Sequence, residues 1–530
     1  MNILSAKIHR FRSRVIRAAS LAYPALVLMA PSLAVWFFAP GWAGIHGVSL
    51  VSVSAFSLGL AAAAFNDLKR FYLVLAPLAL PALLYAGFVI SFDSVPGEGL
   101  WLSIANMNAA EFDSLIHLFS GQLIAALVAT FLYLLCAAGK PAGLFFMRGR
   151  IMALGAIGAV GLGAISALSP APAAGAVHSP LWMKSFPFGV LYDFAATVSE
   201  DQAAASRPID LPVARRTEVQ GREIYVLVIG EATRRDTWQA ELPTAPELAT
   251  DRVISFSDAL AQAVLTKLSV PMLITGTNGH KARRMPTYLH YSKAVGCTPV
   301  WLTMNDVGTP YAGVAAEYFD NWRVPLARKK RYDTDLLPLL EQLLLRHEKL
   351  CVVLHTEGAH SDYVDRYPES FRPHPAGRGG GGERIARDDR PAQRVAYGDA
   401  VAYSQHFLAQ VISMLDRQDA RSFLVYAPDH AENLWDDERG LMLHGFATRT
   451  EFEIPLVMWA SKRFVEQEPG KWAQLRRNKD KPVGNENVLP TLLDAMSIIP
   501  LPGNSLLRNH VAADRVVSID SLDVPFRLVR

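Results

Sequence analysis

The chain has 530 residues, of which 51% are hydrophobic and 19% are charged, and its net charge at pH 7 is +3. It is too apolar for an ordinary soluble or disordered protein and too nearly neutral for a broad nucleic-acid surface, so we expect part of it to lie in lipid. Three cysteines in so long a chain exclude a disulfide scaffold.

The first third of the chain contains five mostly uncharged stretches of about twenty residues, the length that crosses a bilayer. They are residues 18–38, 48–65, 71–92, 118–138 and 151–168. Each could be a buried helix of a soluble core, but five in succession favour a membrane. We therefore predict five transmembrane helices within residues 1–168.

Loop charge predicts the orientation of these helices. Lys and Arg residues precede the first stretch and separate the second from the third and the fourth from the fifth, which places these ends in the cytoplasm. The other two loops, residues 39–47 and 93–117, contain neither Lys nor Arg. An odd number of crossings then leaves everything after Leu168 on the outer side.

Residues 169–222 form a connector that contains Ala, Pro and aromatic residues. It is predicted either as a segment lying along the lipid headgroups or as an ordinary surface linker. From Glu223 onward the composition is that of a soluble domain of roughly 300 residues.

Strand and helix patterns alternate in this last part of the chain. Residues 223–230 (EIYVLVIG) predict a fully buried central strand. Further strands are predicted at 300–303, 351–354, 422–427 and 454–460, and helices at 334–347 and 401–415. The alternation predicts an α/β domain with a central, largely parallel sheet that helices cover on both faces.

Metal-ligating side chains follow three of the predicted strands, at the sheet edge where α/β proteins bind ligands. They are Glu231, His355, His360, Asp429, His430 and, shortly afterwards, His444. A single Glu or His at a strand end is more often a cap or a surface group. Recurrence at three strand ends favours a zinc site, because catalytic zinc takes imidazole and carboxylate ligands and keeps one position open.

A nucleophile for such a site is available in residues 261–276, which contain Thr266, Ser269 and Thr275. Spacing alone does not choose among the three. Thr266 could also be a helix N-cap, which is compatible with catalysis because a helix N-terminus stabilises a phosphate anion.

The segments VLVIGEATRRD, TKLSVPM, LHTEGAH followed by DRYP, YAPDHAEN and LHG resemble the phosphoethanolamine transferases of Gram-negative envelopes, in the same order. These enzymes belong to the alkaline phosphatase and sulfatase superfamily. The resemblance covers essentially the whole chain. It implies a multi-pass protein of the Gram-negative inner membrane, with a transmembrane domain at 1–168, an interfacial linker at 169–222 and a catalytic domain at 223–530 in the periplasm.

The resemblance also implies roles for individual residues. Glu231, Thr266, Asp429 and His430 match the zinc ligands, and Thr266 would also be the nucleophile. His360 and His444 match catalytic histidines that contact the phosphate or a second metal, and Glu432 matches an acidic residue of less defined role. Substrate-binding positions are implied at Asn106, Asn108, Glu111 and Asn305.

The implied reaction transfers phosphoethanolamine from phosphatidylethanolamine to a lipid A or lipopolysaccharide-core acceptor through a phospho-threonine intermediate. One alternative is a phosphoglycerol transferase on the same scaffold, and another is a membrane protein that has lost catalysis and only binds lipid. The chain departs from the family in having no cysteine around Thr266, and Cys297 and Cys351 could either pair or remain free thiols. The acceptor, the number of metal ions and the oligomeric state are left open.

Overall fold

The protein is represented by a computed structural model of two compact units, Met1–Glu200 and Asp201–Arg530. The unit boundary falls inside helix α9 (Phe188–Ala205). The structure describes residues 2–39, 45–65, 67–92, 95–105, 107, 112–113, 115–116, 119–140, 181–205, 209, 214–216, 219–305, 314–320, 331–371, 373–374, 385, 389–438, 440–509, 515–519 and 522–529.

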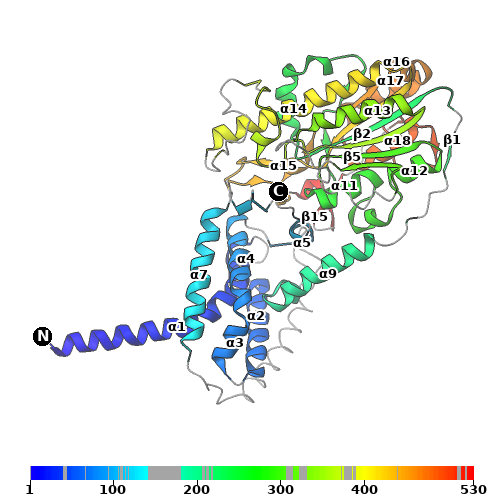
Figure 1. The fold of residues 1–530 in the computed structure, drawn as a ribbon. Coiled ribbons are helices and arrows are strands. Elements are labelled where there is room, and N and C mark those ends of the chain that lie inside the picture. The colour runs from blue at the N-terminus through cyan, green and yellow to red at the C-terminus, as the bar shows by residue number, and fades with distance from the viewer. Residues whose placement is uncertain are drawn as a thin grey trace. The chain divides into compact units, whose positions relative to one another are not determined.

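The first unit is helical (Figure 1). Its helices are α1 (Asn2–Phe38), α2 (Ile45–Ala64), α3 (Leu68–Val74), η1 (Ala76–Leu78), α4 (Ala79–Phe92), α5 (Glu98–Ala105), α7 (Ser120–Ala138), η2 (Leu181–Lys184) and the start of α9. Helix α1 packs against α2, α4 and α7. Their contact surfaces form one apolar core that includes Leu28, Val89 and Tyr133.

The described residues are helical over four of the five predicted membrane-spanning stretches, but not every stretch contains an apolar segment of spanning length. Helix α7 is the single unbroken helix in the described ranges that is long and apolar enough to cross a membrane. Helix α3 and the segment Ala76–Phe92 qualify as one span bent by 48°. The bend follows from Pro77, which lacks the N–H that would continue the helix. Shorter apolar segments lie within α1 (Ala22–Phe38) and α2 (His46–Ala62). Residues 151–168 lie outside the described residues.

Residues 181–200 of the connector pack into the first unit, whereas Arg215 and Arg216 pair with Ile499 and Ile498 of the second unit. Phe186 and Val190 are buried in that unit's core. Lys184 and Asp193 form a buried ion pair at 2.7 Å, and the indole of Trp101 donates to the same carboxylate at 2.9 Å. These buried contacts differ from those of a loosely attached surface linker. The domain boundaries at residues 168 and 222 stay predictions, as does the placement of the connector along the lipid headgroups.

The second unit contains the predicted α/β sheet (Figure 1). Seven strands lie in the order β3-β12-β8-β2-β7-β5-β6. The strands are β2 (Glu223–Gly230), β3 (Val253–Ser255), β5 (Thr298–Thr303), β6 (Glu317–Asp320), β7 (Lys349–His355), β8 (Arg421–Pro428) and β12 (Val457–Ala460). β8, β2, β7, β5 and β6 pair in parallel, and β12 is antiparallel to both of its neighbours. The prediction of a largely parallel sheet is therefore confirmed, with one reversed strand near its edge.

One predicted strand is divided in the structure. Residues 454–460 were expected to form one strand, but β11 (Glu453–Ile454) pairs with β4 (Ala259–Leu260) in a separate sheet, and β12 joins the central sheet. Pro455 lies at the break and has no N–H to donate to a neighbouring strand. The predictions also missed the edge strands β3 and β6.

The remaining elements surround this sheet. The helices are α10 (Arg235–Glu241), α11 (Thr266–Thr275), α12 (Tyr288–Ala294), α13 (Leu337–Arg346), α14 (Arg390–Asp416), α15 (Arg449–Phe452), α16 (Lys462–Gln467), α17 (Pro469–Asn478) and α18 (Val488–Ala495). The 3-10 helices are η3 (Leu242–Thr244), η4 (Pro246–Leu248), η5 (Gly279–Arg284), η8 (Asp333–Leu336), η9 (Tyr363–Asp365), η10 (Asn485–Asn487) and η11 (Phe526–Leu528). The short strands are β1 (Arg215–Arg216), β9 (Asn433–Leu434), β10 (Met442–Leu443), β13 (Val483–Gly484), β14 (Ile498–Ile499), β15 (Val516–Ile519) and β16 (Leu522–Pro525).

Both faces of the central sheet are buried, because alternate residues of β2 point into different cores. Ile224, Val226 and Val228 pack in a core that includes α13 and α14. Tyr225, Leu227 and Ile229 pack in a second core that includes α11, α12 and α18. This arrangement explains why β2 is a continuous apolar run instead of an alternating one.

The end of β2 has no room for a side chain at Gly230. A Cβ there would lie 2.6 Å from the hydroxyl oxygen of Tyr426, whose buried ring stacks on Trp238. We predict that Gly230→Ala lowers the free energy of unfolding by about 1–3 kcal/mol, as measured by denaturant titration of the full chain in detergent. Gly470→Ala in α17 is the matched control, because nothing lies within 4 Å of its added Cβ. Equal stability of the two variants would contradict the prediction.

Candidate metal and catalytic site

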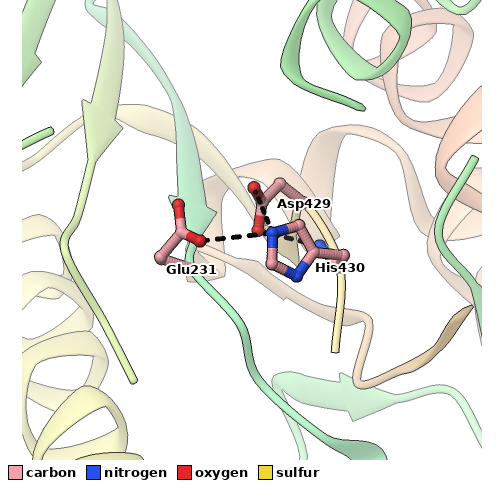
Figure 2. Close-up of side chains that lie close together, drawn as sticks. All are labelled: Glu231, Asp429 and His430. Carbon is pink, nitrogen blue, oxygen red and sulfur yellow. Dashed lines mark hydrogen bonds and ion pairs between the residues drawn. The ribbon is translucent and has the colours of Figure 1, made fainter. Parts of the chain in front are cut away.

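The ends of β2 and β8 place three buried ligand side chains together. The two strands are parallel neighbours with Gly230 opposite Pro428, so Glu231 and Asp429 leave the sheet side by side. One ligand atom from each of Glu231, Asp429 and His430 lies within 4.8 Å of the others, and no other such group of three occurs in the described ranges. His430 Nε2 is 3.3 Å from Glu231 Oε1 and 3.4 Å from Asp429 Oδ2. Figure 2 shows the three side chains converging.

The hydrogen bonds around this cluster orient His430 and Asp429 so that one potential metal-ligating atom of each faces the cluster. His430 Nδ1 lies 3.0 Å from the carbonyl oxygen of Ala431, which can only accept, so Nδ1 carries the proton and Nε2 faces the carboxylates. Asp429 Oδ1 accepts from the N–H groups of Ala232 and His430 at 3.3 and 2.8 Å. Asp429 Oδ2 is buried and accepts no hydrogen bond from the described residues. A divalent cation would satisfy this oxygen, so the residues present fit a zinc-type site.

Thr266 joins the cluster from the first residue of α11. Its hydroxyl is 3.2 and 3.3 Å from the two carboxylate oxygens of Glu231 and 3.3 Å from His430 Nε2. The helix cap is Leu265 and has no side-chain hydrogen bond, so Thr266 is not an N-cap. Ser269 and Thr275 donate instead to the carbonyl oxygens of Asp429 and Pro271. Of the three candidate nucleophiles, the structure brings only Thr266 to the metal-ligating side chains.

Of the predicted histidines, His444 adjoins this cluster and His360 lies beside His444. The ring centroids of His444 and His430 are 4.1 Å apart, and those of His444 and His360 are 6.1 Å apart. His444 Nδ1 lies 3.4 Å from the buried carboxylate of Glu432. His355 ends β7 and is fully buried, with Nε2 bonded to none of the described residues.

Asn305 also lies at the cluster, where its amide donates to Glu231 Oε2 at 3.0 Å. Asn106, Asn108 and Glu111, the other predicted substrate-binding residues, lie outside the described residues. In the second unit, Cys297 and Cys351 are buried free thiols.

The loop before His360 is held by residues that the sequence predictions missed. The carboxylate of Asp333 accepts from the N–H groups of Glu357 and Gly358 at 2.8 and 3.1 Å. Gly358 has φ +47°, and a Cβ there would lie 2.8 Å from the backbone of Glu231. The Gly of EGAH was an available signal, whereas nothing in the pattern around Asp333 indicates its buried contact.

The charges of the cluster favour a cation. Burial raises the pKa of Glu231 to about 7, and the negative charge of Asp429 contributes to the rise. Burial opposes protonation of His430, but the carboxylates of Asp429 and Glu231 outweigh it and raise its pKa to about 10. Burial also holds the pKa of His360 well below its ordinary value, so this imidazole is neutral. A metal ion binding here must displace protons from its ligands.

Comparison with known families matches the second unit to one family. Residues 223–498, just over half of the chain, match the Sulfatase family. Phosphoethanolamine transferase EptA of Helicobacter pylori is 27% identical over 350 residues, which cover 61% of this chain and 64% of that protein. Kdo(2)-lipid A phosphoethanolamine 7''-transferase of Escherichia coli is 27% identical over 288 residues, covering 50% and 49%. The matches thus span between about half and two thirds of these relatives.

Two solved structures have a similar fold. The integral membrane protein lipooligosaccharide phosphoethanolamine transferase A of Neisseria meningitidis superimposes with a TM-score of 0.70 at 22% identity, covering 92% of this chain and 96% of that chain. The C-terminal periplasmic domain of EcEptC from Escherichia coli, solved in complex with Zn, gives a TM-score of 0.54 at 19% identity and covers 61% and 98%. At these identities the likeness establishes the fold.

The raised pKa values predict how metal binding depends on pH. His430, with a pKa of about 10, must lose a proton to bind zinc, and below pH 7 Glu231, with a pKa of about 7, must lose one as well. We predict that zinc affinity rises about tenfold per pH unit between about pH 7 and 9 and more steeply below pH 7. Chelator competition at several pH values measures this, and a pH-independent dissociation constant would contradict it.

The hydrogen bond from Asn305 to Glu231 predicts a role in orienting this carboxylate. We expect Asn305→Ala to weaken zinc binding about 10- to 100-fold, because the partners of metal ligands tune affinity by this amount. Metal content after dialysis against buffered zinc measures the change. Asn504→Ala, at an exposed position, is the control and should bind zinc as the wild type does.

Proposed function

The chain belongs to the Sulfatase family, and we propose that it transfers phosphoethanolamine from phosphatidylethanolamine to a lipid A or lipopolysaccharide-core acceptor. The observation that carries the proposal is the hydroxyl of Thr266 among Glu231, Asp429 and His430. The names of the relatives, phosphoethanolamine transferases of which one acts on Kdo(2)-lipid A, support the transferred group and the acceptor class.

Thr266 is the proposed nucleophile. Its oxygen attacks the phosphorus of the donor, the bond from phosphorus to the glycerol oxygen breaks, and diacylglycerol leaves with a proton. An acceptor oxygen then attacks the phospho-threonine, and the threonine oxygen is released and reprotonated. Thr266 suits this role because it is half-buried, whereas Glu231 and His430 beside it are fully buried. It also begins α11, whose N-terminal N–H groups favour a phosphate anion.

The residues that would hold zinc are Glu231, Thr266, Asp429 and His430. When bound, the ion supplies positive charge for the phosphate oxygens and lowers the pKa of the threonine hydroxyl. The zinc complex of the EcEptC domain supports the choice of metal. His360, neutral and next to His444, is proposed to take or return the proton of the acceptor or leaving oxygen.

The N-terminal part is proposed to anchor this chemistry in the inner membrane of a Gram-negative cell. We propose five spans in residues 1–168, a linker at 169–222 and a periplasmic catalytic domain at 223–530. The apolar helix α7 and the fold shared with an integral membrane transferase support this organisation. Anchoring raises the effective concentration of a lipid donor, and Asn106, Asn108 and Glu111 are proposed to line its headgroup site.

The proposal predicts that Thr266→Ala abolishes transfer. We expect the rate to fall about a thousandfold or more, with the fold retained because truncation of a half-buried side chain costs little packing. The assay follows headgroup-labelled phosphatidylethanolamine with the full chain in detergent. Without acceptor, mass spectrometry should find phosphoethanolamine on the wild-type Thr266 peptide.

Thr237→Ala is the matched control, because this hydroxyl contacts Asp236 and lies outside the cluster. A folded Thr266→Ala variant with full activity would disprove the nucleophile. Transfer from phosphatidylglycerol alone would favour the phosphoglycerol transferase, and absence of transfer from either lipid would favour a binding protein without catalysis.

A further inference from the structure

The loop that carries His444 has an unfavourable backbone conformation. Leu443, Gly445 and Ala447 have φ values of +77°, +98° and +54°. This left-handed region suits glycine, but a Cβ disfavours it at Leu443 and Ala447. Such conformations persist only where surrounding contacts hold them, and they gather at functional sites.

A buried carboxylate supplies the contacts for this loop. Glu451 is fully buried, and its Oε2 accepts from the consecutive N–H groups of Gly445, Phe446 and Ala447, each at 3.0 Å. Its Oε1 accepts from the amide of Asn433. A carboxylate oxygen suits three converging N–H groups because it only accepts hydrogen bonds and carries no hydrogen of its own.

Two polar side chains extend this network to the start of the loop. The amide of Asn433 also donates to the carbonyl oxygen of Leu443 at 2.9 Å. The hydroxyl of Thr448 donates to Asn433 Oδ1 at 2.7 Å. Residues on both sides of His444 are therefore fixed to one buried group.

The same loop and the same glutamate also reach the metal-ligand cluster. The carbonyl oxygen of Glu451 accepts from the N–H of Ala431, which follows His430, at 2.7 Å. A Cβ on Gly445 would lie 3.3 Å from Leu265, the residue before Thr266. A shift of this loop would therefore move His444 relative to both His430 and Thr266.

We propose that Glu451 is a positioning residue, whose carboxylate holds the strained loop and thereby places the His444 imidazole beside the metal-ligand cluster. The inference rests on the proposed transferase function. Glu451 acts through His444, because its carboxylate oxygens are bonded to the loop and to Asn433.

The variant Glu451→Gln tests this role, because it keeps the size of the side chain but replaces one acceptor oxygen with an N–H donor. We expect kcat to fall about 10- to 100-fold, as for displacement of a catalytic group by about 1 Å. The KM for phosphatidylethanolamine should change by less than about threefold and zinc content should remain that of the wild type, since all zinc ligands are intact. Glu453→Gln is the matched control, because Glu453 pairs with Arg235 outside this loop and should keep wild-type activity.

A double-mutant cycle separates positioning from a general structural effect. If Glu451 acts through His444, Glu451→Gln should cost less than about twofold in the residual activity of a His444→Ala background. Fully additive losses, or wild-type kcat in folded Glu451→Gln, would overturn the proposal. Should Glu451→Gln fail to fold, Glu451→Asp replaces it, because it keeps the charge but is one methylene too short. These outcomes are independent of Thr266→Ala, on which the transferase proposal itself stands or falls.

Discussion

The mutual repulsion of two buried carboxylates is the constraint around which the site is built. Glu231 and Asp429 are both fully buried at the ends of adjacent strands, where solvent screens their charges little. A proton on His430 relieves the repulsion in part, and a divalent ion would relieve it more completely. The affinity for a cation is thus a direct result of burying these two carboxylates side by side.

The parallel sheet makes this arrangement rigid. β2 pairs with β7 on one side and β8 on the other, so the residues that follow these strands emerge at one edge. The loops that continue from that edge are then tied down through their backbone N–H groups. Asp333 holds the His360 loop and Glu451 holds the His444 loop. Each histidine is therefore placed by a carboxylate that lies outside the metal-ligand cluster.

The features that could be predicted from the sequence are those marked by the residue types of one short segment. EIYVLVIG was identifiable as a buried strand, and Glu231, Asp429 and His430 were identifiable because ligands follow strand ends. The choice of Thr266 over Ser269 and Thr275 needed family resemblance, since the three differ only in where the helix starts. Asp333 and Glu451 were missed because they bind backbone groups, which every residue has, so no side-chain pattern marks them. The breaks at Pro77 and Pro455 coincide with residues that lack a backbone N–H, so the sequence does carry a signal for them.

The ligands of the site come from distant parts of the chain, and this has a consequence for biosynthesis. Ala232 and Asp429 meet across a separation of 197 residues. No short segment contains the complete set, and a partly folded chain offers a metal ion at most the neighbouring pair Asp429 and His430. Zinc capture would thus follow assembly of the sheet instead of guiding it, and occupancy would mark molecules that have finished folding.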